Sequence, residues 1–384
     1  METLQIVGVM TGTSCDGLDA SCLEFDSEGW KPLWTSSAPY PAPLRKRVLA
    51  IQEPKSRHPL SEVQGLHRDL GEWYGKTLAR MLKNRPADVI ANHGQTIGHF
   101  PATRGTGGVT LQSGDPTRIV AATGLTCVSH FRDGDMAVGG QGAPLVPLFH
   151  QLLADKLGGA EQGIAIHNIG GISNLTYLGP GDQVLAFDTG PGNAWIDAAV
   201  ALVTRGRQKM DKGGKLALKG EPDAKAIDAC LKHEFFSLKP PKSTGRDDFP
   251  FQLLLSKFKK RDHNLIATAT WVTIESIANA YERFILKPEL PLERIIICGG
   301  GAKNETLLEG LRVRLPGIEI ESMEEAGWDP QAVEAQAFAY FGFLSLLGMP
   351  IGGPWTGARE YGPPGQITPG RNWTELLGKV SKLR

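Results

Sequence analysis

The chain has 384 residues, and its 41 Lys and Arg side chains balance its 41 Asp and Glu side chains. This length is too great for one small core, so two lobes are expected. The zero net charge disfavours nucleic-acid binding, which depends on clustered Lys and Arg, and no stretch approaches the roughly 18–20 apolar residues of a membrane span. Residues 1–8 lack the basic region of a secretion signal, so a cytoplasmic location is expected.

The five cysteines are scattered through the sequence and include no CxxC pair. An odd number without metal-ligand spacing argues against a disulfide framework and against a zinc site. Cys22, Cys127 and Cys298 lie in apolar, strand-like runs. We expect these three in the core.

The first half of the chain predicts strands with one long helix. Residues 4–25 read as a strand, a glycine turn and a second strand. Apolar residues at helical spacing predict a helix over 61–84, with Ser61 as its N-cap. A short strand, 87–92, ends at the sequence HGQT, and VTLQSG and LTCVSHF are two more strand candidates. A helix is expected over 145–157, with Pro144 suited to its first turn.

The opening pattern then returns. An apolar run over 163–169, a small-residue turn over 170–174 and the sequence LTYLG again read as strand, turn and strand. We interpret this as a weak internal duplication, which predicts two related lobes. Further on, helices are expected over 264–286 and 302–315, and Asp329 is expected to cap a helix that runs to about residue 347.

Three glycine-containing loops are suited to binding a nucleotide. Backbone N–H groups in the turn Gly12–Gly17 can form an anion nest, where Asp16 and Asp19 would require a cation such as Mg²⁺. The loop Asp188–Asn193 precedes a helix, and a helix N-terminus favours anions. The run Gly299–Gly301 lets a flat group such as adenosine lie on the backbone. Each loop alone also fits an ordinary hairpin, cap or turn.

Two further motifs offer hydrogen-bonding groups for a polyhydroxylated ligand. These are His93–Thr96 and Phe131–Asp135, although an isolated histidine such as His93 is more often a structural residue. Glu334 fits either a solvated helix face or a cleft, because its neighbours are small or apolar.

A series of short motifs occurs in a fixed order along the chain: GTSCDGLD, HGQTIGH, LQSGDP, FRDGDMAVGGQGAPLVP, NIGGISNLT, FDTGPGN, PPKSTGRDDF, CGGGAKN and EAQAFAY. Together they resemble the 1,6-anhydro-N-acetylmuramic acid kinase family, and the resemblance runs from about Val7 to Pro369. The resemblance implies an α/β, two-lobed actin-like ATPase (ribonuclease H-like) fold with mixed sheets flanked by helices and the nucleotide in the cleft between lobes. We expect one lobe over 1–132 plus 353–384 and the other over 133–352.

The resemblance also implies an activity. With ATP and Mg²⁺, such an enzyme opens the 1,6-anhydro ring of 1,6-anhydro-N-acetylmuramic acid with water and phosphorylates O6, giving N-acetylmuramic acid 6-phosphate in peptidoglycan recycling. A homodimer is implied as well. A kinase for another anhydro-sugar, such as levoglucosan, and a non-catalytic actin-like ATP switch remain alternatives. The sequence assigns no role to the stretch PKSTGRDDF.

The implied site residues fall into four groups. Asp188 is the catalytic carboxylate, and Asp16 contacts the metal directly or through water. The sugar is held by Thr96, Arg132, Asp188 and Glu334. ATP is bound by Gly12, Thr13, Ser14, Cys15, Asp16, Gly17, Leu18, Asp19, Gly170, Gly171, Gly190, Gly192, Asn193, Gly299, Gly300, Gly301 and Asn304.

Overall fold

The chain divides into two compact units. The computed structural model describes residues 2–13, 15–53, 56–101, 107–159, 161–245 and 248–383. The first unit comprises Met1–Phe149 and Gln331–Arg384, and the second, His150–Pro330, is inserted between these two segments. These boundaries differ from those expected after residues 132 and 352. Ser14, expected to bind ATP, and Arg246 and Asp247 of the PKSTGRDDF stretch lie outside the described residues.

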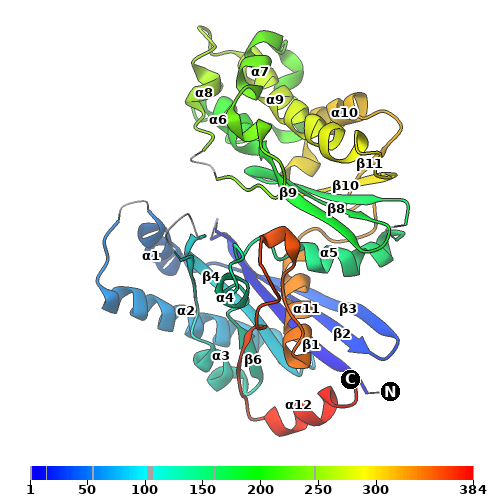
Figure 1. Cartoon of the computed structure of the whole chain (residues 1–384). Coiled ribbons are helices and arrows are strands. Elements are labelled where there is room, and N and C mark those ends of the chain that lie inside the picture. Colours follow the sequence, from blue (N-terminus) through cyan, green and yellow to red (C-terminus); the bar gives the residue numbers. More distant parts are fainter. Residues whose placement is uncertain are drawn as a thin grey trace. The chain divides into compact units, whose positions relative to one another are not determined.

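The first unit contains a mixed sheet (Figure 1). Within the described residues its strands are β1 (Leu4–Thr11), β2 (Gly17–Asp26), β3 (Gly29–Pro39), β4 (Val89–Phe100), β5 (Val109–Ser113), β6 (Thr126–Ser129) and β12 (Gln366–Thr368). Their order is β12-β6-β4-β1-β2-β3, with β5 paired to β4. Strands β1, β2 and β3 form an antiparallel meander, while β1, β4 and β6 run parallel.

The helices of the first unit include α1 (Ala42–Gln52), α2 (Leu60–Met81), α3 (Pro116–Thr123), α4 (Asp133–Ala137), α11 (Val333–Leu347) and α12 (Trp373–Val380), and α5 (Pro147–Ala154) crosses the boundary between units. Helix α11 packs on β1, β2 and β4. Its approach is so close that a Cβ at Gly8 would lie 1.8 Å from the carbonyl oxygen of Ala335. The expected boundary assigned α11 to the second lobe, but this packing places it in the first unit.

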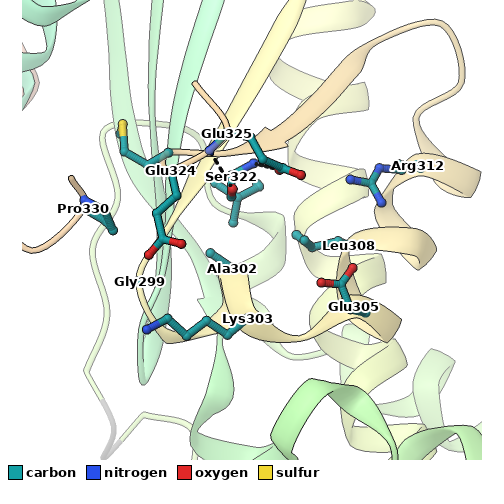
Figure 2. Close-up of a pocket in the computed structure, with 12 residues that line it drawn as sticks. Gly299, Ala302, Lys303, Glu305, Leu308, Arg312, Ser322, Glu324, Glu325 and Pro330 are labelled. Atoms are coloured by element: carbon teal, nitrogen blue, oxygen red, sulfur yellow. Dashed lines mark hydrogen bonds between the residues drawn. The ribbon is translucent and has the colours of Figure 1, made fainter. Parts of the chain in front are cut away.

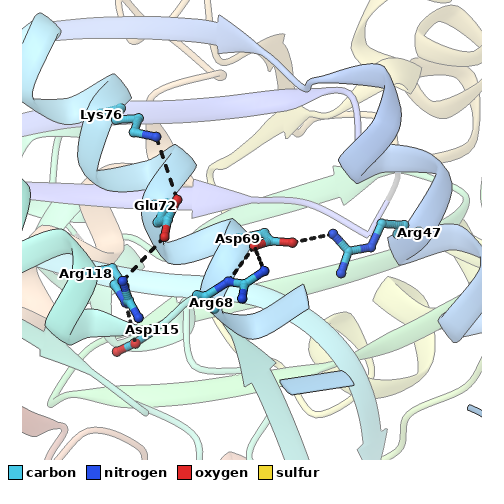
Figure 3. Close-up of polar contacts among 7 residues, drawn as sticks. All are labelled: Arg47, Arg68, Asp69, Glu72, Lys76, Asp115 and Arg118. Atoms are coloured by element: carbon cyan, nitrogen blue, oxygen red, sulfur yellow. Dashed lines mark hydrogen bonds and ion pairs between the residues drawn. The ribbon is translucent and has the colours of Figure 1, made fainter. Parts of the chain in front are cut away.

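Helix α2 has one buried face, formed by residues at helical spacing that include Leu66, Leu70, Tyr74 and Leu78. Its N-cap is Pro59, and Ser61 was the wrong choice, because the helix already begins at Leu60. On its outer side, ion pairs join α1, α2 and α3 through Arg47, Arg68, Asp69, Glu72, Lys76, Asp115 and Arg118 (Figure 3). Surface pairs contribute only about 0–1 kcal/mol each, so the buried face fixes the helix.

The second unit has the same kind of sheet. Its described strands are β7 (Ile164–Ile169), β8 (Ile172–Gly179), β9 (Gln183–Pro191), β10 (Arg294–Cys298) and β11 (Glu319–Ser322), in the order β11-β10-β7-β8-β9. Its helices include α6 (Asn193–Val203), α7 (Ala224–Leu231), α8 (Gln252–Leu255), α9 (His263–Tyr281), continued by a π-helical turn (Glu282–Leu286), and α10 (Glu305–Arg314). Helix α9 is buried along most of its length in the core of this unit.

Both sheets follow one plan, which confirms the predicted duplication. In each, a three-stranded antiparallel meander (β1–β3 or β7–β9) pairs through its first strand with a parallel strand, β4 or β10, and that strand pairs in parallel with β6 or β11. Helices flank the mixed sheets. Two copies of this plan in one chain form the actin-like ATPase fold.

Several predicted boundaries were wrong. The helix expected from Asp329 begins at Val333, because its first backbone bond runs from Gln336 to Ala332. The HGQT motif lies inside β4 and not after it, since pairing with β5 extends that strand. Asp188 likewise lies within β9.

The predicted core cysteines are confirmed. All five cysteines lie in the described part of the chain, and each is buried and free of disulfides. None of the helices in the described residues has both the length and the hydropathy that crossing a membrane requires.

Candidate functional site

The turn between β1 and β2 is held by hydrogen bonds to its carbonyl groups. Gln95 Nε2 donates to Gly12 O (3.2 Å), and Arg45 Nε donates to Cys15 O (3.0 Å). Cys15 is buried and adopts a left-handed backbone conformation (φ 54°), and its N–H closes the turn on Gly12 O (3.1 Å). The side chains of Thr13 and Asp16 are exposed. The turn is therefore preorganised, with a hydroxyl and a carboxylate facing water.

The remaining predicted ATP residues of this hairpin lie in β2. Leu18 is fully buried in the core, so only its backbone is available to a ligand. Asp19 accepts a hydrogen bond from Ser37 Oγ (2.6 Å).

The predicted magnesium contact is compatible with the residues present. Among the described residues, no group of three or more His, Cys, Asp or Glu side chains forms a metal site. Mg²⁺ is usually held by one or two carboxylates, several waters and the phosphates of the substrate. The exposed carboxylate of Asp16 fits a cation of this kind, which would arrive with the nucleotide.

Arg132 lies at the centre of a polar cluster in the first unit. Its Nε donates to His93 Nε2 (3.0 Å), and its Nη1 donates to Gly142 O (2.7 Å). Because the guanidinium can only donate, His93 Nε2 is an acceptor and the neutral ring carries its proton on Nδ1, which has no partner among the described residues. Burial holds the pKa of His93 well below its usual value, and the charge of Arg132 lowers it further.

Glu334, at the start of α11, is close enough to this cluster for its charge to interact with that of Arg132. Burial lowers the pKa of Arg132 to about 10, and Glu334 opposes this shift. Loss of hydration among the surrounding protein atoms raises the pKa of Glu334. The positive charge of Arg132 lowers this pKa, and the negative charge of Asp19 raises it further. Water nevertheless reaches the Glu334 side chain. The structure thus brings together Arg132 and Glu334, two of the residues predicted to bind the sugar.

The loop beside Arg132 is fixed by Asp135. Its Oδ2 accepts from the backbone N–H of Gly142 (2.7 Å), and its Oδ1 accepts from Thr356 Oγ1 (2.6 Å). Thr96, the third predicted sugar contact in this unit, has no recorded bond to Arg132. Its hydroxyl accepts from Gln112 Nε2 (3.4 Å), on the paired strand β5.

In the second unit, two of the predicted glycine loops, Asp188–Asn193 and Gly299–Gly301, meet the turn that contains Gly170 and Gly171, which are also predicted to bind ATP. Asn193 N donates to Gly170 O (2.7 Å), and Asn193 Nδ2 donates to Ile169 O (2.8 Å). A Cβ at Gly192 would lie 2.4 Å from Gly170 O, and one at Gly301 would lie 2.5 Å from the side chain of Ile169. Only residues without side chains fit these approaches, so the glycines let the backbones of the three segments pack against one another.

A cavity of about 500 Å³ opens beside the third loop. Gly299, Ala302 and Lys303 form one side, while the turn after β11, from Ser322 to Glu325, forms another (Figure 2). Asn304, also predicted to bind ATP, uses its side chain to cap α10 by accepting from Leu307 N (3.1 Å). Cavities of this size suit a group as large as a nucleoside.

Asp188 is held by the segment 242–244. Its backbone N–H donates to Lys242 O (3.0 Å), and its Oδ2 accepts from the backbone N–H of Thr244 (2.8 Å). No described residue donates a hydrogen bond to Oδ1. Burial raises the pKa of Asp188 to about 6, opposed by the Thr244 bond and by the charge of Lys242. One oxygen is thus fixed while the other remains free to accept a proton near neutral pH.

A β-bulge lies directly after Asp188. Ser173 pairs with Gly190 and Asn174 with Asp188, so Thr189 is the extra residue. Its hydroxyl contacts Ser173 Oγ (2.8 Å), which contacts His167 Nε2 (2.7 Å), and His167 Nδ1 contacts Tyr281 OH (3.0 Å). Burial lowers the pKa of His167 to about 3, so its ring is neutral in this chain of bonds. Bulges commonly redirect side chains beside active sites, and this one is fixed from within the core.

Sequence reasoning missed the contact of Lys242 and Thr244 with Asp188. Both residues belong to the PKSTGRDDF stretch, whose only signal was its place in the ordered series of motifs. Asp188 belongs to the second unit, whereas Thr96, Arg132 and Glu334 belong to the first.

Comparison with known proteins decides the family. A family model described as anhydro-N-acetylmuramic acid kinase matches residues 4–370. The chain belongs to this family. Among members with that name, the Gloeobacter violaceus protein is 38% identical, over 96% of this chain and 100% of its own length. The Acidithiobacillus ferrooxidans protein is 39% identical, over 98% of this chain and 95% of its own. The Caldanaerobacter subterraneus protein is 36% identical, over 90% and 92%.

Solved structures resemble the chain more distantly. A ROK family glucokinase from Streptomyces griseus aligns with a TM-score of 0.35 and 11% identity, over 88% of this chain and 98% of its own. A likeness this low adds nothing to the fold, which the strand order already defines.

Proposed function

We propose that this chain is an ATP-dependent kinase that hydrolyses the 1,6-anhydro bond of 1,6-anhydro-N-acetylmuramic acid and phosphorylates O6. Family membership supports the substrate and the reaction. The observation that carries the mechanism is Asp188, whose carboxylate has one fixed oxygen, one free oxygen and a pKa raised to about 6.

The proposed reaction needs a base for water, because an anhydro-sugar has no O6 hydroxyl to deprotonate. Asp188 takes a proton from a water molecule as the water oxygen bonds to the anomeric carbon. The bond between that carbon and O6 breaks, and O6 bonds to the γ-phosphorus of ATP while ADP leaves. The phosphoryl group thus replaces the acid of an inverting glycosidase. A general base contributes typically about 10²–10⁴-fold to rate.

ATP is assigned to the glycine loops. The turn Gly12–Asp19 and the loops at Gly170–Gly171 and Gly190–Asn193 would bind the phosphates, since phosphoryl transfer depends on positioned donors and charge neutralisation. The cavity beside Gly299–Gly301 would take adenosine. Mg²⁺ would bind through Asp16, neutralising phosphate charge. The family resemblance also supports a homodimer and a cytoplasmic location.

Arg132, Glu334 and Thr96 are assigned to the sugar. Arg132 uses Nε and Nη1 within the protein, and guanidinium has five N–H donors in a planar fork. The donors that remain suit the lactyl carboxylate of the muramic substrate. Levoglucosan has no such carboxylate, and no observation favours that substrate or a non-catalytic switch.

The test is to incubate the protein with ATP, Mg²⁺ and either 1,6-anhydro-N-acetylmuramic acid or levoglucosan, in separate reactions. Sugar 6-phosphate is then measured by mass spectrometry. Product from the muramic sugar alone is expected. Product from levoglucosan alone would change the substrate, and product from neither would reject the kinase.

Asp188→Asn tests the mechanism. The amide oxygen can still accept from Thr244 N–H, but the base is lost, so turnover should fall by about 10²–10⁴-fold. A raised carboxyl pKa means that the ionised form is disfavoured in the folded state, so the melting temperature should be equal or higher. Near-normal turnover would remove Asp188 from catalysis.

A further inference from the structure

The segment 242–244 contacts Asp188 in two ways. Lys242 O and Thr244 N both bond to this residue, one to its backbone and the other to Oδ2. These bonds link β9 to a segment more than fifty residues later, in a stretch to which neither the sequence nor the comparisons assign a role. They fix where the carboxylate lies.

The side chain of Lys242 is held over three aromatic rings. Its Nζ lies 4.3 Å from the ring centroid of Phe235, 5.5 Å from that of Phe284 and 5.8 Å from that of Phe187, the residue before Asp188. Nζ also donates to Phe235 O (3.3 Å). Cation–π contacts of this kind favour the ammonium form. The ammonium group of Lys242 is therefore held beside the strand that carries Asp188, and these two residues form no salt bridge with each other.

We propose that Lys242 is a positioning residue that orients the Asp188 carboxylate through the segment 242–244 and keeps it ionised through its caged ammonium group. The inference rests on the proposed function, in which Asp188 is the base. Holding the ammonium group of Lys242 among the three aromatic rings, away from a direct ion pair, suits this role. A direct ion pair would occupy the Asp188 oxygen that must accept a proton. An ammonium group held at a distance still favours the ionised carboxylate and leaves Oδ1 free.

The charged groups around this pair give the expected pH dependence. Burial lowers the pKa of Lys242 to about 8, the charge of Arg283 lowers it further, and Asp188 raises it. Arg283 is itself tied to the carbonyl groups of Phe236 (2.8 Å) and Ser237 (2.9 Å). For Asp188, the charge of Lys242 lowers the pKa against burial. Below pH 8 Lys242 is charged, so removing it must raise the pKa of Asp188.

The experiment is the pH profile of kcat/KM from pH 5 to 9 for wild type, Lys242→Met and Lys242→Arg. Wild type should lose activity below about pH 6, where Asp188 becomes protonated. In Lys242→Met this acid limb of the pH profile should move to higher pH by about one unit. That shift means about tenfold less activity than wild type at pH 5.5 and little change at pH 8. Lys242→Arg keeps the charge and should keep the limb. If Lys242→Met does not fold, Lys242→Gln replaces it.

A uniform loss of kcat at every pH, with no movement of the limb, would show that Lys242 is only structural and would overturn the inference. The KM for ATP should not change. Failure of the proposed function is distinguishable, because an active Asp188→Asn variant would reject Asp188 as the base. If Asp188→Asn is inactive but the acid limb of Lys242→Met stays where it is in wild type, only the role proposed for Lys242 is rejected.

Discussion

Replacing Arg132 with alanine tests how the sugar is recognised. The change removes a guanidinium that donates to His93 Nε2 and Gly142 O and leaves both groups without this donor. Each unpaired buried group costs about 1–3 kcal/mol, so the free energy of unfolding should fall by a few kcal/mol. If the free donors bind the substrate carboxylate, a further charge-assisted interaction of about 1.5–3 kcal/mol is lost. That loss corresponds to roughly a ten- to hundred-fold rise in KM for the sugar.

The assay compares two anhydro-sugars that differ only in the lactyl group. Steady-state KM is measured with 1,6-anhydro-N-acetylmuramic acid and with 1,6-anhydro-N-acetylglucosamine, which has no carboxylate. Arg132→Ala should raise KM for the first much more than for the second. Thermal melting separates this effect from instability, and Arg132→Lys, which keeps a charge but not the fork, should have an intermediate KM. An equal change in KM for both sugars would refute the carboxylate contact.

Two more predictions concern the residues that position the site. Thr189→Val removes the hydroxyl that fixes the bulge, so kcat should fall by about tenfold with unchanged KM for ATP. Thr189→Ser should retain activity, and a Thr189→Val enzyme that melts early but turns over normally would contradict the prediction. Gly8→Ala forces a Cβ against Ala335 O, so the free energy of unfolding should fall by about 3 kcal/mol. Gly378→Ala is its control, because outside the neighbouring residues and backbone of its own helix no atom lies within 4 Å of that Cβ. Equal melting temperatures for the two variants would refute the packing argument.

Local patterns were enough to predict the hairpin that opens each sheet. The strand–turn–strand pattern near residues 8 and 168 corresponds to the β1–β2 and β7–β8 hairpins, because neighbouring strands and glycine turns leave a signal within a short stretch of sequence. The glycine loops near Gly170, Gly192 and Gly301 were found for the same reason, and their meeting follows from the strand order.

Contacts between distant segments were not predictable in the same way. The extension of β4 depends on β5, and the assignment of α11 to the first unit depends on packing against β1. The contact of Thr244 with Asp188 uses a backbone N–H, which any residue except proline can supply. No residue type marks such a contact, so only the folded structure identifies it.

The insertion of the second unit has a consequence for biosynthesis. The second unit is one continuous segment, His150–Pro330, whereas the first needs α11, β12 and α12, which follow residue 330. Domains usually fold in the order in which the ribosome makes them. Here the first sheet cannot receive its central helix or its edge strand until the inserted unit has been synthesised. The unit that begins first in the sequence therefore finishes folding last, and until then the apolar faces of β1 and β4 lack their cover on the nascent chain.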